Sequence, residues 1–167
     1  MIQGIENNIV RIQKAFDDCQ IKEINIYNQA FLIQDRPLLK TANMHPVTKY
    51  ELPLVIPFKG DISGRAICLL DTFDKEIQNS EKAIFQSLYT EGMNILLGQY
   101  FTELERASEL TSLIGAPKII NMEKAHQLIE FSQDKMNYQM GYTLISNFRE
   151  FDCRIYFILD HTKEHKA

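Results

Sequence analysis

The chain has 167 residues, a formal net charge of −4 and 45% hydrophobic residues, which is typical of one globular domain with a buried core. The acidic balance and the lack of a Lys/Arg run disfavour nucleic acid and anionic membranes as partners. No apolar run is long enough to span a bilayer, and residues 1–8 lack the pattern of a secretory signal. These features predict a cytoplasmic protein.

Cysteine and histidine positions argue against a metal centre. The three cysteines are far apart and form no CxxC motif, which predicts free thiols in a reducing compartment: Cys19, Cys68 and Cys153. His161 and His165 have an i,i+4 spacing, but they lie in a short polar tail without further ligands. We therefore expect a single domain over residues 1–160, a polar tail at 161–167 and no bound metal.

The N-terminal part of the chain predicts a helix followed by strands. Ile5, Ile9, Ile12 and Phe16 recur at helical spacing, which indicates an amphipathic helix over about residues 3–19. The following segment, 22–34, alternates and is rich in Ile, Phe and Tyr, so one or two strands are expected there. A segment with two prolines, 35–47, is expected to be a loop.

A β-hairpin is expected next. Two apolar segments, 51–58 and 62–71, flank a Gly-Asp turn signal. Pro53 and Pro57 would either place the first segment at a sheet edge or restrict which of its amides pair.

A long helix is predicted from about residue 81 to residue 114, after a short helix or turn at 71–79. Ser80 is a plausible N-cap for it. Gly115, followed by Pro117, is a plausible stop signal.

The remaining elements complete an α+β pattern. A short strand at 118–121 and a short helix at 122–132 are followed by a second hairpin, formed by 139–146 and 151–159. We therefore predict an α+β fold with a largely antiparallel sheet and a long central helix.

Two stripes divide the long helix. Six apolar residues at helical spacing are predicted to face the core: Phe85, Tyr89, Met93, Leu96, Tyr100 and Leu104. Ser87, Glu91, Asn94 and Gly98 follow one another at spacings of four, three and four residues, on the opposite side. The polar stripe should therefore face solvent or a partner.

The polar stripe pairs a carboxylate with a carboxamide, which suits the placing of a water molecule against a phosphoryl group. Exposed Glu and Asn are also common on helices without any function. Gly98 is harder to explain in this way, because a mid-helix glycine costs about 1 kcal/mol relative to alanine and often marks close approach of a partner. Ile84, Leu88 and Ile95 flank the stripe and could pack on a neighbouring helix or form the rim of a recognition surface.

These residues resemble the signature of the CheC, CheX and FliY phosphatases of bacterial chemotaxis. That signature is Asp or Ser, three residues, Glu, two residues, Asn, twenty-two residues, Pro. Here Ser87, Glu91, Asn94 and Pro117 match each defined position and each gap. The run from Asn94 to Gly98 also looks like the N-I-x-x-G stretch of many members. The first predicted helix supplies no second E-x-x-N, so the chain looks like the single-signature CheX type.

The resemblance implies a function and roles for the residues that match. The substrate would be the aspartyl phosphate of a CheY-like response-regulator receiver, which supplies its own Mg²⁺, so that this chain binds no cofactor. Asn94 would orient the attacking water and Glu91 would pair with the receiver's lysine. Ser87, Ile95 and Gly98 would contact the partner. Pro117 is interpreted as a chain-reversal device outside the site.

The resemblance also implies that the N-terminal helix packs against the long helix and that the protein is a homodimer. The segment between Leu70 and Ser80 is shorter than expected for CheX, which bears on dimer geometry more than on chemistry. Two other interpretations stay open. One is a non-catalytic adaptor of the same fold that binds a receiver or a flagellar-switch component, and the other is an unrelated α+β domain.

Overall fold

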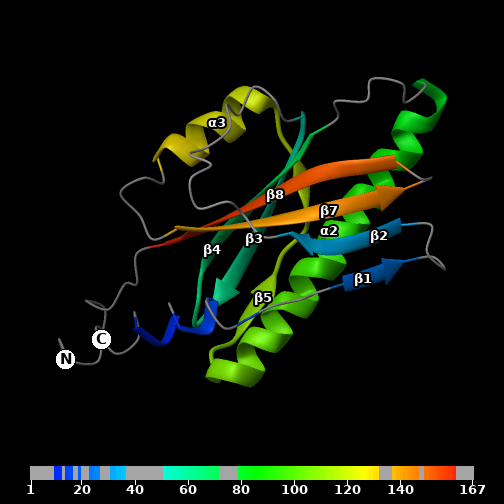
Figure 1. The fold of residues 1–167 in the computed structure, drawn as a ribbon. Helices are drawn as coiled ribbons and strands as arrows, with labels where there is room; N and C mark the ends of the chain where they lie inside the picture. Colours follow the sequence, from blue (N-terminus) through cyan, green and yellow to red (C-terminus); the bar gives the residue numbers. More distant parts are fainter. Residues whose placement is uncertain are drawn as a thin grey trace.

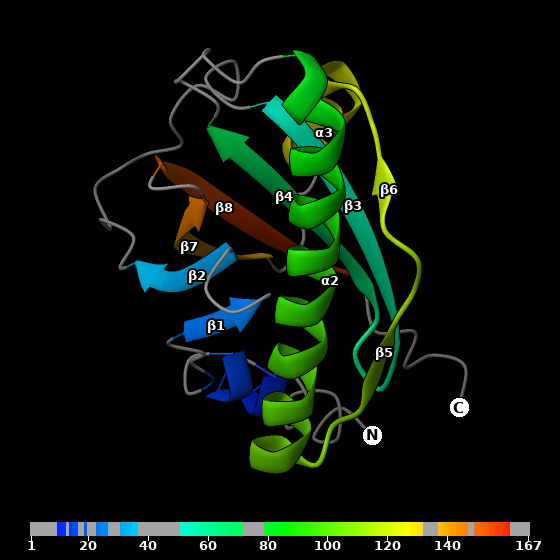
Figure 2. The same ribbon diagram turned by 90° about the vertical axis from the view of Figure 1, so that its right-hand side faces the viewer.

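A computed structural model describes residues 10–12, 14–16, 19, 23–26, 31–36, 51–71, 79–131, 137–146 and 149–160. The longest element is a 30-residue helix that runs across the molecule (Figures 1 and 2). In chain order the elements are β1 (Glu23–Ile26), β2 (Phe31–Arg36), β3 (Glu51–Gly60), β4 (Gly64–Asp71), α2 (Asn79–Ser108), β5 (Ser112–Ile114), β6 (Lys118–Ile119), α3 (Met122–Phe131), β7 (Asn137–Ser146) and β8 (Arg149–Leu159).

The strands form one eight-stranded sheet in which each pairing is antiparallel. Its order is β1-β2-β7-β8-β4-β3-β5, and β6 also pairs with β3. Both predicted hairpins are present, as β3–β4 and β7–β8. The predicted α+β class with a largely antiparallel sheet is therefore confirmed.

The two faces of the sheet carry different helices, because side chains alternate along each strand. On β8, Cys153, Ile155 and Phe157 pack in the main core, which contains the apolar stripe of α2. On the opposite face of β8, Tyr156 and Ile158 pack in a smaller core with α3. Figure 1 shows α2 and α3 on opposite sides of the sheet.

Part of the predicted N-terminal helix is seen. Residues 10–12 and 14–16 are helical, and Phe16 is buried in the main core. Its ring stacks on Tyr138 with centroids 4.4 Å apart and meets Phe157 edge-on. Cys19, at the end of the helix expected over 3–19, is not assigned as helical, although its amide donates to the Ala15 carbonyl at 2.9 Å, and the other residues of that range lie outside the described residues. The structure also does not describe 37–47 of the expected loop, 72–78 of the expected turn or the tail at 161–167, whereas Asp35 and Arg36, expected in the loop, belong to β2 instead.

Strand β3 is not a free edge, so one of the two expectations for its prolines is wrong. It pairs with β4 on one side and with β5 and β6 on the other. Pro57 lies between the stretches paired with β5 and β6, where its carbonyl accepts a hydrogen bond from the Gly115 amide at 2.7 Å. Leu52 has a φ of 50°, next to a register shift near Pro53. The prolines restrict pairing, as the second expectation had it.

Helix α2 begins at Asn79 and ends at Ser108, so both predicted boundaries need correction. Ser80 falls inside the helix. At the other end, Glu109 adopts a φ of 63°, a left-handed conformation that stops helical propagation, and its amide bonds the Glu105 carbonyl at 2.7 Å. The Arg11 guanidinium donates to the terminal Ser108 carbonyl at 2.7 Å. Residues 112–114 instead form β5, because the side of β3 next to them offers unpaired backbone groups.

Within the part of the chain that the structure describes, no helix is both long and apolar enough to cross a membrane.

Candidate functional site

The two stripes of α2 lie where the sequence predicts them. The six residues of the apolar stripe are all buried in the main core. On the other side, Ser87 and Glu91 are exposed, while Asn94 and Gly98 are partly exposed. The carboxylate and the carboxamide therefore project from the side of the helix that faces away from the sheet.

A groove of about 620 Å³ runs along this side of α2. Six helix residues and two residues from the segment after the helix line it: Ala83, Gln86, Ser87, Thr90, Glu91, Asn94, Pro117 and Ile119. Glu91 and Asn94 therefore share one surface depression with Ser87, one turn back along the helix.

The second side of the groove comes from the segment that returns along α2, here called the strap (residues 109–121). Figure 2 shows β5 and β6 of the strap running beside α2 along the sheet margin. Pro117 and Ile119 lie at and just after the junction between these two strands. The groove is thus formed by elements that are distant in sequence and are held together by the sheet.

Two hydrogen bonds fix the strap on either side of Pro117. The Gly115 amide donates to Pro57 O at 2.7 Å, and the Ile120 amide donates to Pro53 O at 3.1 Å. A Cβ added at Gly115 would lie 2.9 Å from the Pro57 ring, so this glycine allows the close approach. Pairing of Ile119 with Leu54 adds a third constraint.

The groove carries a single charged residue among those that line it, and that residue is Glu91. No lysine, arginine or histidine is among the described residues of its lining. The Thr90 hydroxyl donates to the Gln86 carbonyl at 2.8 Å, so its oxygen is left to accept. The described lining thus offers one carboxylate and several hydrogen-bonding groups, and it contains no cationic side chain.

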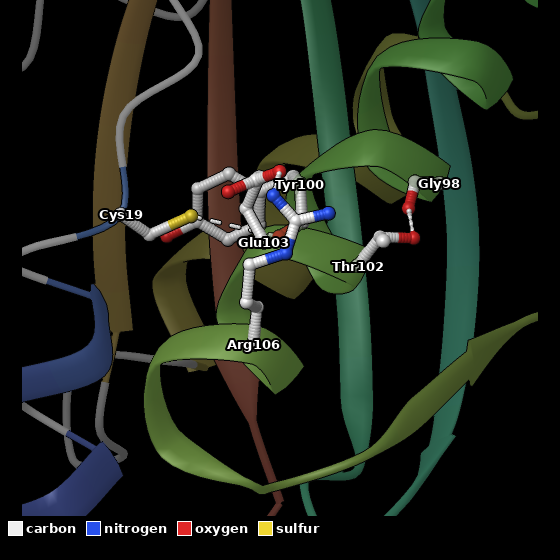
Figure 3. A network of polar contacts seen from close by, with 6 residues as sticks. All are labelled: Cys19, Gly98, Tyr100, Thr102, Glu103 and Arg106. Atoms are coloured by element: carbon white, nitrogen blue, oxygen red, sulfur yellow. Dashed lines mark hydrogen bonds and ion pairs between the residues drawn. The ribbon is translucent and has the colours of Figure 1, made fainter.

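Gly98 lies beyond the groove on the same stripe. A Cβ added there would meet only the Ile114 Cδ1 at 3.8 Å, an ordinary van der Waals distance. Its carbonyl accepts a hydrogen bond from the Thr102 hydroxyl at 2.8 Å (Figure 3). The packing of the described residues therefore leaves room for a methyl group at this position.

The apolar residues that flank the polar stripe behave differently from one another. Leu88 and Ile95 are partly buried and pack against the main core. Ile84 remains 65% exposed, as expected for a rim residue.

The structure brings together three of the five residues predicted for the site, namely Ser87, Glu91 and Asn94. Ile95 and Gly98 lie on the same helix but are not among the residues that line the groove. The residues that sequence reasoning left out include Thr90, Pro117 and Ile119. Pro117 carries a signal in the sequence, because its spacing from Asn94 is part of the signature, whereas Ile119 carries none.

The described residues contain no group of three or more His, Cys, Asp or Glu side chains that could hold a metal ion.

Comparisons with known proteins add a likeness in fold. No protein-family model matches the sequence, and no curated protein sequence matches it. Among solved structures, the fold is similar to a chain in the crystal structure of the CheX–CheY–BeF₃–Mg²⁺ complex from Borrelia burgdorferi. The likeness covers 94% of this chain and 97% of that chain, with a TM-score of 0.47 and 16% sequence identity.

Proposed function

We propose that this chain is a phosphatase that hydrolyses the aspartyl phosphate of a CheY-like response-regulator receiver domain. The observation that carries the proposal is the joint position of Glu91 and Asn94 in one open groove, which the signature proline, Pro117, also lines. A chance match to the signature would not require its distant proline to meet the helix at the same place.

The reaction requires a water molecule in line with the bond that breaks. The water oxygen bonds to phosphorus while the bond between phosphorus and the aspartyl oxygen breaks, which yields inorganic phosphate and a free aspartate. The transition state of phosphoryl transfer is loose, so catalysis consists mainly of positioning and charge neutralisation. A site without a strong base is adequate for such a step.

Asn94 is proposed to orient this water. A carboxamide can accept a hydrogen bond from the water through its oxygen and donate one to a phosphoryl oxygen through its nitrogen. This is the role that a glutamine performs in GTPases. The partial exposure of Asn94 leaves its side chain accessible to a partner.

Glu91 is proposed to pair with the lysine of the receiver's active site, which docks the two proteins in register. Charge-assisted hydrogen bonds of this kind are about twice as strong as neutral ones. The Mg²⁺ that neutralises the phosphoryl oxygens would be supplied by the receiver.

The test is phosphate release from phosphorylated receivers. Each CheY-like receiver of the source organism is phosphorylated with acetyl phosphate in the presence of Mg²⁺, desalted, and followed with and without substoichiometric amounts of the chain. Faster release, with many turnovers per chain, supports the proposal. Binding to a beryllofluoride-activated receiver without any acceleration of phosphate release would favour the adaptor instead.

A further inference from the structure

The strap exposes an isoleucine to the same groove that holds the acid and the amide. Ile119 is 45% exposed on a two-residue strand, and its side chain lines the groove with Glu91 and Asn94. Several other large apolar residues of the described chain are also exposed, namely Val10, Ile84, Leu113 and Phe131, but none of them lines the groove. Ile119 is therefore placed to contact whatever brings a phosphoryl group to Asn94.

We propose that Ile119 and Pro117 form a specificity wall, an apolar surface that binds nonpolar side chains of the receiver beside its phosphorylated aspartate. The proposal rests on the function proposed above and names how the same site selects its substrate. Asn94 and Glu91 act on groups that all receivers share, whereas the wall contacts the surface around them, which differs between receivers.

The wall is fixed in position, as a surface that discriminates between partners must be. Ile119 pairs with Leu54, and the next amide, that of Ile120, bonds Pro53 O at 3.1 Å. On the other side of Pro117, the Gly115 amide bonds Pro57 O at 2.7 Å. Because β3 lies inside the sheet, these contacts hold the wall at a set separation from α2.

Charge identifies the occupant as a protein. The groove contains the Glu91 carboxylate and no cationic residue among the described residues that line it. A free phosphate or a small acyl phosphate would find no cationic side chain to pair with in that lining. A receiver domain carries its own lysine and Mg²⁺ to the groove, so the phosphoryl group arrives already neutralised. Its surrounding surface must then lie against the wall.

The apolar contact has a counterpart across the polar stripe. On the helical wheel of α2, Ile84 lies on the side of Glu91 that faces away from the strap, and it is 65% exposed. A partner seated over Glu91 and Asn94 would therefore have apolar residues on both sides. Apolar contacts around a polar centre exclude water from it, which strengthens the central polar interactions.

The experiment compares Ile119→Ser with Leu113→Ser. Leu113 lies on the same strap and is 81% exposed, but it does not line the groove, so it controls for loss of an exposed apolar residue. We expect Ile119→Ser to raise the KM for the phosphorylated receiver about tenfold, which equals about 1.4 kcal/mol of affinity, with kcat within about twofold of the parent. Leu113→Ser should leave both constants unchanged. Ile119→Val should have the same KM as the parent chain, since valine keeps a branched apolar side chain.

Ile119→Thr keeps the β-branched shape that strands favour, and it replaces Ile119→Ser if that variant melts early. If Ile119→Ser and Ile119→Thr both leave the KM unchanged, the proposed specificity wall is wrong. It is also wrong if either variant lowers kcat at constant KM. If the parent chain releases no phosphate from any receiver, the proposed phosphatase function fails. The specificity wall is then tested by the Kd for a beryllofluoride-activated receiver. Equal Kd values for the parent chain and Ile119→Ser contradict the wall, and so does a lack of binding by both. Acceleration of acetyl phosphate hydrolysis by the parent chain also contradicts the assignment of a protein substrate.

Discussion

Asn94 and Pro117 are separated by twenty-two residues in the sequence and line the same groove in the structure. From the sequence alone, Pro117 is expected to reverse the chain and to lie outside the site. The structure places it at the junction of β5 and β6, beside the polar stripe of α2. The spacing between the two residues corresponds to the length of chain that completes α2, reverses, and returns as the strap.

Replacing Glu91 tests the docking role. Glu91→Gln keeps the size of the side chain and removes its charge, so a charge-assisted contact worth about 1.5–3 kcal/mol would weaken. The Kd for a beryllofluoride-activated receiver should rise by one to two orders of magnitude, and the salt dependence of binding should decrease. Glu105→Gln is the matched control, since Glu105 is an exposed carboxylate of α2 outside the groove. Equal Kd values for the two variants would contradict the role of Glu91.

Gly98→Ala separates stability from partner binding. Alanine is favoured over glycine in a helix by about 1 kcal/mol, and the added methyl group would meet only an ordinary contact. We expect the free energy of unfolding in urea to rise by up to about 1 kcal/mol, while affinity for the receiver falls because a close approach is blocked. Gln99→Ala controls for alanine at an exposed position on another side of α2. A variant that is more stable and binds as tightly as the parent would show that Gly98 does not contact the partner.

Glu109→Gly tests how the helix is stopped. Glu109 has a φ of 63°, a conformation that costs a non-glycine residue about 1 kcal/mol or more and that glycine adopts freely. The substitution should stabilise the protein by about 1 kcal/mol in urea denaturation and leave phosphate release unchanged. Glu105→Gly, within the helix, should destabilise it by a similar amount. Stabilisation by both variants, or by neither, would contradict this account of the helix end.

Buried thiols predict a loss of stability at alkaline pH. Burial raises the pKa of Cys19 from 9.0 to about 11, with a smaller contribution from Glu103, and burial also raises the pKa of Cys68 and Cys153. Between pH 9 and 11 the unfolded chain therefore releases protons that the folded chain keeps, and the free energy of unfolding falls as pH rises. Urea denaturation at pH 7, 9 and 10.5 measures the slope, which Cys19→Ala should reduce. A flat profile up to pH 10.5 would show that the thiols do not contribute.

The two faces of α2 could be predicted because the periodicity is strong and local. Six apolar residues at helical spacing fix which side meets the sheet, and Glu91 and Asn94 then have to face outwards. Both hairpins could also be predicted from local signals, because each consists of two apolar segments on either side of a short turn, and the first turn carries a Gly-Asp pair. These features need no knowledge of distant contacts.

The end of α2 and the second side of the groove could not be predicted in this way. The sequence places Ser112–Ile114 in the helix because Gly115 and Pro117 form a stop signal just after it, but pairing with β3 and the left-handed Glu109 decide its structure. Ile119 entered the groove through the same non-local pairing. Tertiary contacts of this kind override local preference and leave little trace in the local pattern.

The central claim is that Asn94 positions the water that attacks phosphorus, and Asn94→Ala tests it most directly. Phosphate release is measured in single turnover at a saturating concentration of the variant, together with the Kd for the beryllofluoride-activated receiver and with Gln99→Ala as the control. Loss of the positioning group should slow release about 10²-fold, equal to about 2.7 kcal/mol of barrier, with Kd within about twofold of the parent. Release from Asn94→Ala at the parental rate would contradict the account.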